Sequence, residues 1–106
     1  MLSKSTAWGQ FHQIIEKGGF LMQFDGALIQ EQGVRFAIVV VKPYVLNSAE
    51  KEIIRNKFKV CFGQIPIILM AQNSRGIPTY DGRYDIVKYL VNIHPSRIPW
   101  KRYTIS

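Results

Sequence analysis

The segment "RFAIVVVKPY", residues 35–44, decides the fold because it contains an unbroken apolar run that stops at Lys42. Residues 37–41 are all alanine, isoleucine or valine, with no polar residue at alternate positions. A strand of this composition needs apolar cover on both faces, which predicts that it lies in the centre of a sheet. Pro43 cannot continue a ladder of hydrogen bonds, so we expect Lys42 to end the strand in water.

The residues before this strand predict an antiparallel partner for it. The stretch "FLMQFDGALIQEQGVRFAIVVVK", residues 20–42, fits a long hairpin that turns at Gln32-Gly33. Asp25-Gly26 is also a two-residue turn signal, and a turn there would divide the stretch into three short strands. We prefer the long hairpin and keep the three-strand arrangement as its alternative.

The spacing of apolar residues predicts a helix near each end of the chain. The first covers residues 5–17 and stops at Gly18-Gly19. The other covers residues 83–93 and is broken by Pro95. Their apolar faces consist of Trp8, Phe11, Ile14 and Ile15 in the first, and Ile86, Tyr89, Leu90 and Ile93 in the second.

A further helix is predicted over residues 48–62, between the central strand and the next apolar segment. Asn47 followed by Glu50 is typical of a helix start, and Gly63 supplies the stop. The side chains expected to be buried are Ile53, Ile54, Phe58 and Cys61, and those expected to face solvent are Lys51, Arg55, Lys57 and Lys59.

The remaining segments complete a mixed α/β fold. "PIILMAQ", residues 66–72, is a second apolar strand, and the helix before it favours a parallel arrangement with the central strand. Residues 73–82 read as a loop, and residues 98–105 as a last extended segment with Trp100 packed on the domain. We therefore predict one domain over residues 1–106, a sandwich of about three helices and a mixed sheet of four to five strands, in the order α-β-β-α-β-α-β.

Composition restricts the class of protein. The 106 residues are 47% hydrophobic and 20% charged, a globular balance, and no apolar run approaches the roughly 18 residues of a membrane span. The N-terminus lacks the apolar region of a signal peptide, and the single Cys61 forms no internal disulfide, so we expect a soluble protein in a reducing cytoplasm. With only His12 and His94 beside that cysteine, we expect neither a metal site nor a cofactor.

The formal net charge of +7 points to a polyanionic partner such as nucleic acid, through long-range attraction and release of counterions. The charge is uneven along the chain. From residue 75 onward, six Lys or Arg residues oppose two Asp or Glu residues, which places +4 of the net charge in the last 32 residues.

Two segments of this C-terminal part carry candidate binding residues. In "HPSRIPWKRY", residues 94–103, cations alternate with aromatic rings, as single-stranded nucleic acid requires for its phosphates and bases. The loop "NSRGIPTYDGRYD", residues 73–85, places arginines beside tyrosines after a core strand. The predicted nucleic-acid-binding residues are Arg75, Arg83, Arg97, Trp100, Lys101 and Arg102.

Each segment also has a purely structural interpretation. Trp100 could close the core while its basic neighbours stay in water. In the loop, Asp81 could cap the helix that follows, and Arg83 could pair with its acidic neighbours.

The layout of residues 5–71 resembles, in topology, nucleases of the restriction-endonuclease type. These place an acidic residue at the start of one strand of a hairpin and a Glu-x-Lys at the end of the next, to hold magnesium and orient the attacking water. The resemblance implies a metal-dependent nuclease with Asp25, Glu31 and Lys42 as its catalytic residues. The position two before Lys42 is Val40, however, where the motif requires a carboxylate.

Our leading prediction is a non-enzymatic domain that binds a polyanion such as nucleic acid through its C-terminal half. The divergent nuclease is one alternative, and a protein-interaction or assembly module is the other. A homodimer is compatible with exposed strand edges. We expect no membrane partner.

Overall fold

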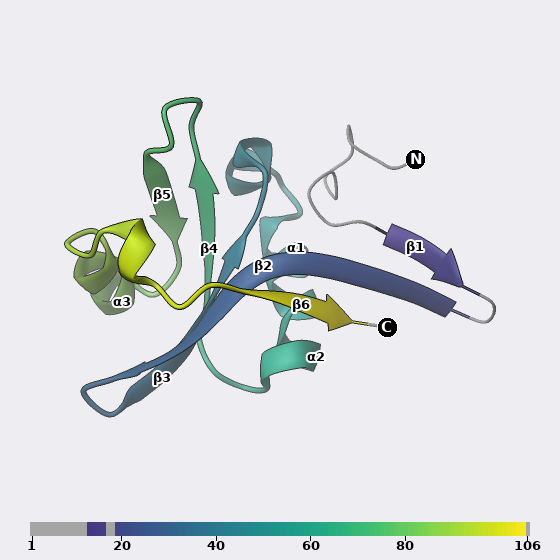
Figure 1. Cartoon of the computed structure of the whole chain (residues 1–106), viewed down its shortest axis with the longest axis horizontal. Coiled ribbons are helices and arrows are strands. Elements are labelled where there is room, and N and C mark those ends of the chain that lie inside the picture. Colours follow the sequence, from purple (N-terminus) through teal and green to yellow (C-terminus); the bar gives the residue numbers. More distant parts are fainter. Residues whose placement is uncertain (1–12, 17–18, 106) are drawn as a thin grey trace.

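A mixed β-sheet forms the framework of the computed structural model, which describes residues 13–16 and 19–105 (Figure 1). Within these residues the sheet has six strands, in the order β1-β2-β3-β4-β5, with β6 paired to β2. The strands are β1 (Gln13–Glu16), β2 (Gly19–Glu31), β3 (Val34–Val40), β4 (Ile67–Gln72), β5 (Pro78–Asp81) and β6 (Lys101–Ile105).

The long strand β2 connects the rest of the sheet because it pairs with three other strands. Gly26 is opposite Val39 of β3 and also opposite Lys101 of β6, so these two strands lie on opposite edges of β2. A Cβ atom on Gly26 would lie 2.8 Å from the carbonyl oxygen of Ile38, closer than real contacts allow. The Asp25-Gly26 pair is therefore a close approach between strands, and the alternative turn at this point is wrong.

The predicted long hairpin and the parallel crossover are both confirmed. Gln32 and Gly33 join β2 to β3, with φ angles of +51° and +79°, as a tight two-residue hairpin turn requires. Strand β3 then runs parallel to β4, with Val40 opposite Met70. The apolar run of β3 is covered on both faces, as its composition predicted.

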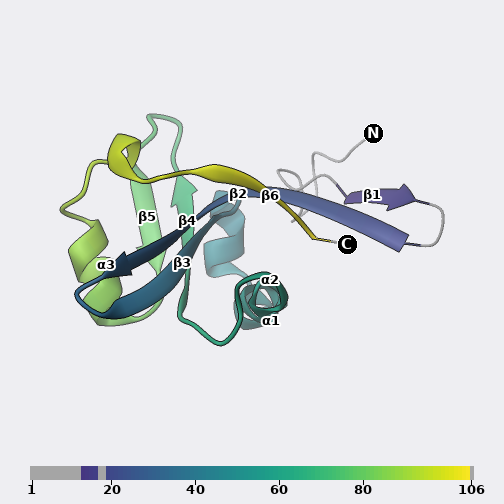
Figure 2. The same cartoon turned by 60° about the horizontal axis from the view of Figure 1, so that its bottom comes forward.

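Alternate residues of β3 and β4 belong to two separate cores, one on each face of the sheet. Helices α1 (Lys51–Lys57) and α2 (Lys59–Phe62) and the 3-10 helix η1 (Pro43–Asn47) cover the first face, and α3 (Tyr84–Leu90) covers the second (Figure 2). Phe24, Val39, Phe58 and Leu69 are buried in the first core. Phe36, Ile38, Ile68 and Leu90 are buried in the second core.

The predicted number and order of the helices are corrected at the N-terminal side. Residues 13–16, which were expected to end a helix, form β1 and pair with residues 19–22 of β2. The rest of the predicted helix, residues 5–12 and 17, lies outside the described residues. Two β-branched residues in a row favour a strand, and the extended start of β2 supplies a partner that local spacing does not reveal.

The middle helix is shorter than predicted and is broken at Phe58. Ile54 and Phe58 are buried as expected, but Ile53 is 59% exposed, so its predicted burial is wrong. Cys61 is half-buried against the first core, and its burial raises the pKa of its thiol. Glu50, and not Asn47, precedes the first turn, because residues 43–47 are already wound into η1.

The predicted loop 73–82 contains a strand. Pro78–Asp81 forms β5, which pairs antiparallel with β4 and places Tyr80 opposite Met70. The short 3-10 helix η2 (Pro95–Arg97) then leads from α3 into the final strand, β6. No helix in the described part of the chain combines the length and the apolar character needed to cross a bilayer.

Candidate polyanion-binding pocket

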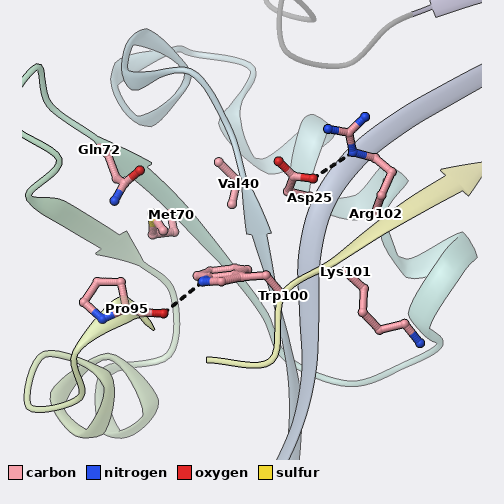
Figure 3. Close-up of a pocket in the computed structure, with 8 residues that line it drawn as sticks. All are labelled: Asp25, Val40, Met70, Gln72, Pro95, Trp100, Lys101 and Arg102. Carbon is pink, nitrogen blue, oxygen red and sulfur yellow. Dashed lines mark hydrogen bonds and ion pairs between the residues drawn. The ribbon is translucent and has the colours of Figure 1, made fainter. Parts of the chain in front are cut away.

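An open pocket of about 370 Å³ lies where the parallel strands β3 and β4 end (Figure 3). Ligands commonly bind beyond the carboxyl ends of strands in such sheets. The lining residues come from four strands and from the segment before β6, and they are Asp25, Val40, Met70, Gln72, Pro95, Trp100, Lys101 and Arg102. Three of the predicted nucleic-acid-binding residues therefore lie together at one pocket: Trp100, Lys101 and Arg102.

The sheet register places the central residues of the pocket in one row across the strands. Arg102 of β6 is opposite Asp25 of β2, and Val40 of β3 is opposite Met70 of β4. Because Gly26 is opposite Val39, the next position along brings Asp25 beside Val40. The row thus has a charged end on β6 and β2 and an apolar centre on β3 and β4.

Asp25 and Arg102 form an ion pair at the charged end of the row. The Nε–H of Arg102 donates to Asp25 Oδ1 over 2.7 Å, and both side chains are about half exposed. Within residues 13–16 and 19–105, the two terminal nitrogens of Arg102 have no acceptor. These nitrogens can donate to a phosphate without breaking the contact to Asp25.

Trp100 forms the wall of the pocket opposite Gln72 (Figure 3). Its indole N–H donates to the carbonyl of Pro95 over 2.9 Å, and its backbone N–H donates to Ile98 at 2.8 Å. Pro95 lies in η2, and His94 caps this 3-10 helix, because its Nδ1 accepts from the backbone N–H of Ser96. These contacts hold the indole in place before any ligand binds.

Gln72 is the last residue of β4, and its amide is oriented by the loop that follows. Its Nε2 donates to the carbonyl of Gly76 over 2.9 Å. The Asn73 side chain accepts from the backbone N–H groups of Arg75 and Ile77, which fixes the loop. The amide oxygen of Gln72 is thereby directed toward Val40 (Figure 3).

Lys101 contributes to the pocket differently from Arg102, because neighbouring side chains of a strand point to opposite faces. The Lys101 ammonium lies 5.7 Å from the ring centre of Tyr103, which packs on the first core. Figure 3 shows the side chain directed away from Gln72 and Arg102. Trp100 and Arg102 therefore provide the side chains on the pocket face.

The other predicted binding residues lie elsewhere. Arg75 belongs to the β4–β5 loop, close to Gln72 in sequence, and Arg97 lines a different groove, which Glu31 also lines. Arg83 lines a hollow at Ile67, which is the first residue of β4, whereas Gln72 is the last. At about 3.3 Å per residue, these two ends of β4 are about 16 Å apart. The guanidinium of Arg83 is paired with Asp85 at 2.8 Å, as the structural interpretation proposed.

The three residues of the nuclease interpretation are not gathered in one pocket. Asp25 lies in the pocket at the carboxyl ends of the strands, beside Val40. Glu31 is at the other end of β2, next to the hairpin turn, where it lines a groove with Tyr89. Lys42 lies just after β3 at the start of η1 and is half-buried. Among the described residues, no three His, Cys, Asp or Glu side chains could together hold a metal ion.

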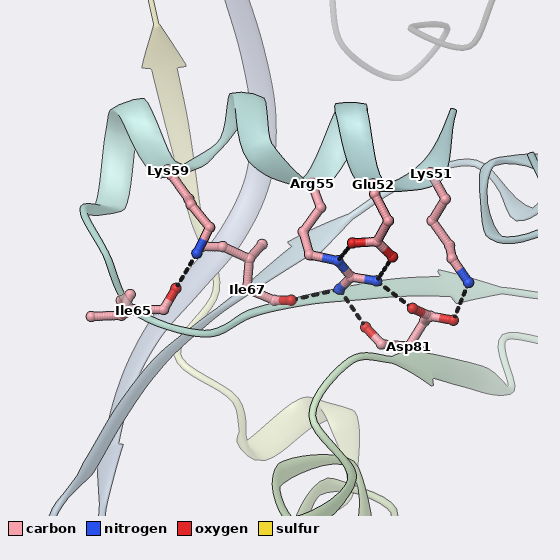
Figure 4. Close-up of polar contacts among 7 residues, drawn as sticks. All are labelled: Lys51, Glu52, Arg55, Lys59, Ile65, Ile67 and Asp81. Carbon is pink, nitrogen blue, oxygen red and sulfur yellow. Dashed lines mark hydrogen bonds and ion pairs between the residues drawn. The ribbon is translucent and has the colours of Figure 1, made fainter. Parts of the chain in front are cut away.

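A separate polar cluster joins α1 to the β4–β5 side of the sheet (Figure 4). Arg55 is only 12% exposed and hydrogen-bonds Glu52, the carboxylate of Asp81, and the backbone carbonyls of Ile67 and Asp81 at 2.7 and 3.0 Å. Lys51 also donates to Asp81 over 2.9 Å. The predicted solvent exposure of Arg55 is therefore wrong, because Arg55 joins α1 to β4 and β5. The Asp81 side chain binds Lys51 and Arg55 of α1 and does not cap α3.

The cluster shifts the pKa of the Asp81 carboxylate. Partial burial acts to raise the pKa of Asp81, but the hydrogen bonds from Lys51 and Arg55 outweigh it, so the pKa lies below the ordinary value. Every donor of Arg55 named here is directed at the protein itself. We therefore assign this cluster to stability and not to ligand binding.

Sequence reasoning missed Val40, Met70 and Gln72 as pocket residues. The available signal was the polar Gln72 at the carboxyl end of a buried strand, a position where α/β sheets bind ligands. Comparisons of this chain with protein-family models, with curated proteins and with solved structures found no match.

Proposed function

We propose that this protein binds single-stranded nucleic acid at the pocket formed by β2, β3, β4 and β6. One observation carries the proposal: Trp100 and Arg102 lie on the same face of one short segment, and both line the pocket. The indole offers a surface on which a base can stack, and the free guanidinium nitrogens offer donors for the adjacent phosphate. Each nucleotide of a single strand presents both a base that can stack and a phosphate that can accept hydrogen bonds.

The charge of the chain supports the same partner. A net charge of +7 raises the local concentration of any polyanion and speeds its association. At the pocket face, Arg102 supplies the positive charge and Asp25 is the acidic residue among the lining residues, while the Lys101 side chain is directed to the other face of β6. The pocket is open to solvent, and a strand of nucleic acid can therefore cross it.

The test is fluorescence titration of a labelled single-stranded oligonucleotide at several salt concentrations. Arg102→Ala is expected to weaken binding and to reduce the slope of log affinity against log salt by about one unit, as for one lost phosphate contact. Lys101→Ala is expected to have a smaller effect, because its side chain lies on the other face of β6.

Arg83→Ala is the matched control. Arg83 and Arg102 are both exposed arginines paired with an aspartate, at 2.8 and 2.7 Å respectively, so the two substitutions remove the same charge from similar surroundings. Only Arg102 lies at the pocket. Equal losses of affinity in the two variants would show that binding depends on overall charge and not on the pocket. If the wild type shows no salt-sensitive binding, nucleic-acid binding is wrong and the protein-interaction module takes its place.

The nuclease alternative remains a proposal of lower rank. Asp25 is the acidic residue that supports it, although Asp25 lies in the middle of β2 and not at its start. Val40 lies beside Asp25, and Glu31 is at the far end of β2. A homodimer also stays a prediction. Strand β5 pairs only with β4 among the described strands, and light scattering after gel filtration at several concentrations would test whether copies associate.

A further inference from the structure

We infer that the pocket distinguishes among bases, preferring adenine and cytosine, which carry an exocyclic amino group, over thymine and uracil. The inference rests on the proposed function and concerns the edge of the base that enters the pocket. It follows from the direction of two oxygen atoms, one on Gln72 and one on Asp25.

The first oxygen is Oε1 of Gln72. The amide nitrogen of this side chain donates to the carbonyl of Gly76, which can only accept, so the oxygen is the atom left for a ligand. Figure 3 shows this oxygen directed toward Val40, over the centre of the pocket. In the described part of the chain it accepts no hydrogen bond.

The second oxygen is Oδ2 of Asp25. The other carboxylate oxygen, Oδ1, accepts from Arg102, so the ion pair fixes which oxygen faces the pocket. Figure 3 shows the free oxygen directed toward Val40 from the side opposite Gln72. The described residues supply no donor to it.

The pocket therefore presents two acceptors across an apolar floor. Val40 and Met70 are neighbours in the sheet register and carry no donor, and the indole N–H of Trp100 is already bonded to Pro95. A base that enters between the two oxygens must bring hydrogen-bond donors, because a buried acceptor without a donor costs free energy.

Bases differ in whether they supply such donors. Adenine and cytosine carry an amino group with two N–H donors on the edge where thymine and uracil carry a carbonyl oxygen. Thymine and uracil have one donor on this edge, N3–H, which can bond only one of the two acceptors. Their carbonyl oxygen would face the other acceptor without forming a bond. The volume of about 370 Å³ lies at the low end of the range of small-molecule sites, which suits a single nucleotide and not a run of stacked bases.

The test compares oligo(dC) with oligo(dT) of equal length, since both are pyrimidine strands and carry the same charge. The wild type is expected to bind oligo(dC) about tenfold more tightly at moderate salt. Gln72→Met, which keeps the length of the side chain and removes the acceptor, is expected to weaken oligo(dC) binding and leave oligo(dT) binding unchanged.

Asp25→Asn provides a second and independent variant. Arg102 still requires an acceptor, so the amide would orient its oxygen toward Arg102 and its nitrogen toward the pocket. This changes an acceptor into a donor, and the ratio of oligo(dC) to oligo(dT) affinity is expected to fall below that of the wild type.

The outcomes separate the inference from the proposed function. Equal, salt-sensitive binding of the two oligonucleotides by the wild type would overturn the base preference and leave nucleic-acid binding intact. Absence of binding to either strand would overturn both. If Gln72→Met does not fold, as circular dichroism would show, an unchanged affinity ratio in Asp25→Asn would still overturn the inference.

Discussion

Asp25 and Arg102 face each other directly across β2 and β6, and Arg102 Nε donates to Asp25 Oδ1 over 2.7 Å. Both side chains are about half exposed, so water screens the pair and its contribution to stability is at most about 1 kcal/mol. Its larger consequence is for the pocket, where the carboxylate offsets the charge of the guanidinium and holds it against β2.

Asp25→Asn therefore separates the binding interpretation from the nuclease interpretation. Removing the negative charge next to the phosphate position is expected to increase affinity for a mixed-sequence single strand by about threefold at low salt. A metal-dependent nuclease would instead lose cleavage, because its metal ligand is gone. Titration and a cleavage assay with magnesium, run on the same preparations, decide between them.

Val40→Glu tests whether a single added carboxylate beside Asp25 is enough to create a metal site. The new carboxylate would lie beside Asp25 in the row of pocket residues, and two carboxylates at that spacing are what a divalent ion requires. We expect calorimetric titration with manganese to detect binding in this variant, with Val40→Gln as the uncharged control of similar size. Magnesium-dependent cleavage by the wild type that Lys42→Ala abolishes would place the enzyme interpretation first.

The cluster around Arg55 predicts a stability change with pH. Asp81→Asn is expected to lower the free energy of unfolding at pH 7 by about 2 kcal/mol, because charge-assisted hydrogen bonds to Lys51 and Arg55 are lost. Asp85→Asn breaks the exposed pair with Arg83, which water screens, and is expected to leave the free energy of unfolding almost unchanged.

The sign of the pH effect follows from the lowered pKa of Asp81. A carboxylate whose pKa is lower in the folded protein than in the unfolded chain stabilises the fold at pH values above the unfolded pKa. This contribution is lost as the pH falls through the folded pKa. The difference between wild type and Asp81→Asn is therefore expected to narrow below about pH 4. Urea unfolding of both proteins at a series of pH values measures this difference in the free energy of unfolding. A difference that stays constant down to pH 2 would contradict the stabilising role of the ionised Asp81.

Gly26→Ala tests the close approach of β2 to β3. The added Cβ would meet the carbonyl oxygen of Ile38 at 2.8 Å, and a backbone atom cannot move aside cheaply. We expect a loss of about 1–3 kcal/mol, as for overpacking of a core. Gly33→Asn is the control, since nothing lies within 4 Å of its Cβ position and asparagine tolerates a positive φ. Equal stability of the two variants in urea would contradict the close approach.

Local patterns predicted the elements with strong periodicity and failed where partners came from far along the chain. The run at residues 37–41 predicted a central strand, because only a fully covered strand can be apolar on both faces. The spacing around Arg55 predicted an exposed cation, but β5 lies across that face and supplies Asp81. β5 itself was predicted as loop, because only its pairing with β4 makes residues 78–81 a strand.

The sequence by itself determined the central strand, and it favoured the hairpin turn at Gln32-Gly33 and a shared face for Trp100 and Arg102, since each of these depends on residues close together in the chain. It also favoured a parallel arrangement of β3 and β4, because a helix lies between them in the chain. Only the tertiary structure decided that Arg102 lies opposite Asp25. Likewise, the alignment of Val40 with Met70, and hence the pocket, is fixed by the register between strands. Register depends on how residues distant in the sequence bury their apolar faces together, and no local pattern contains that information.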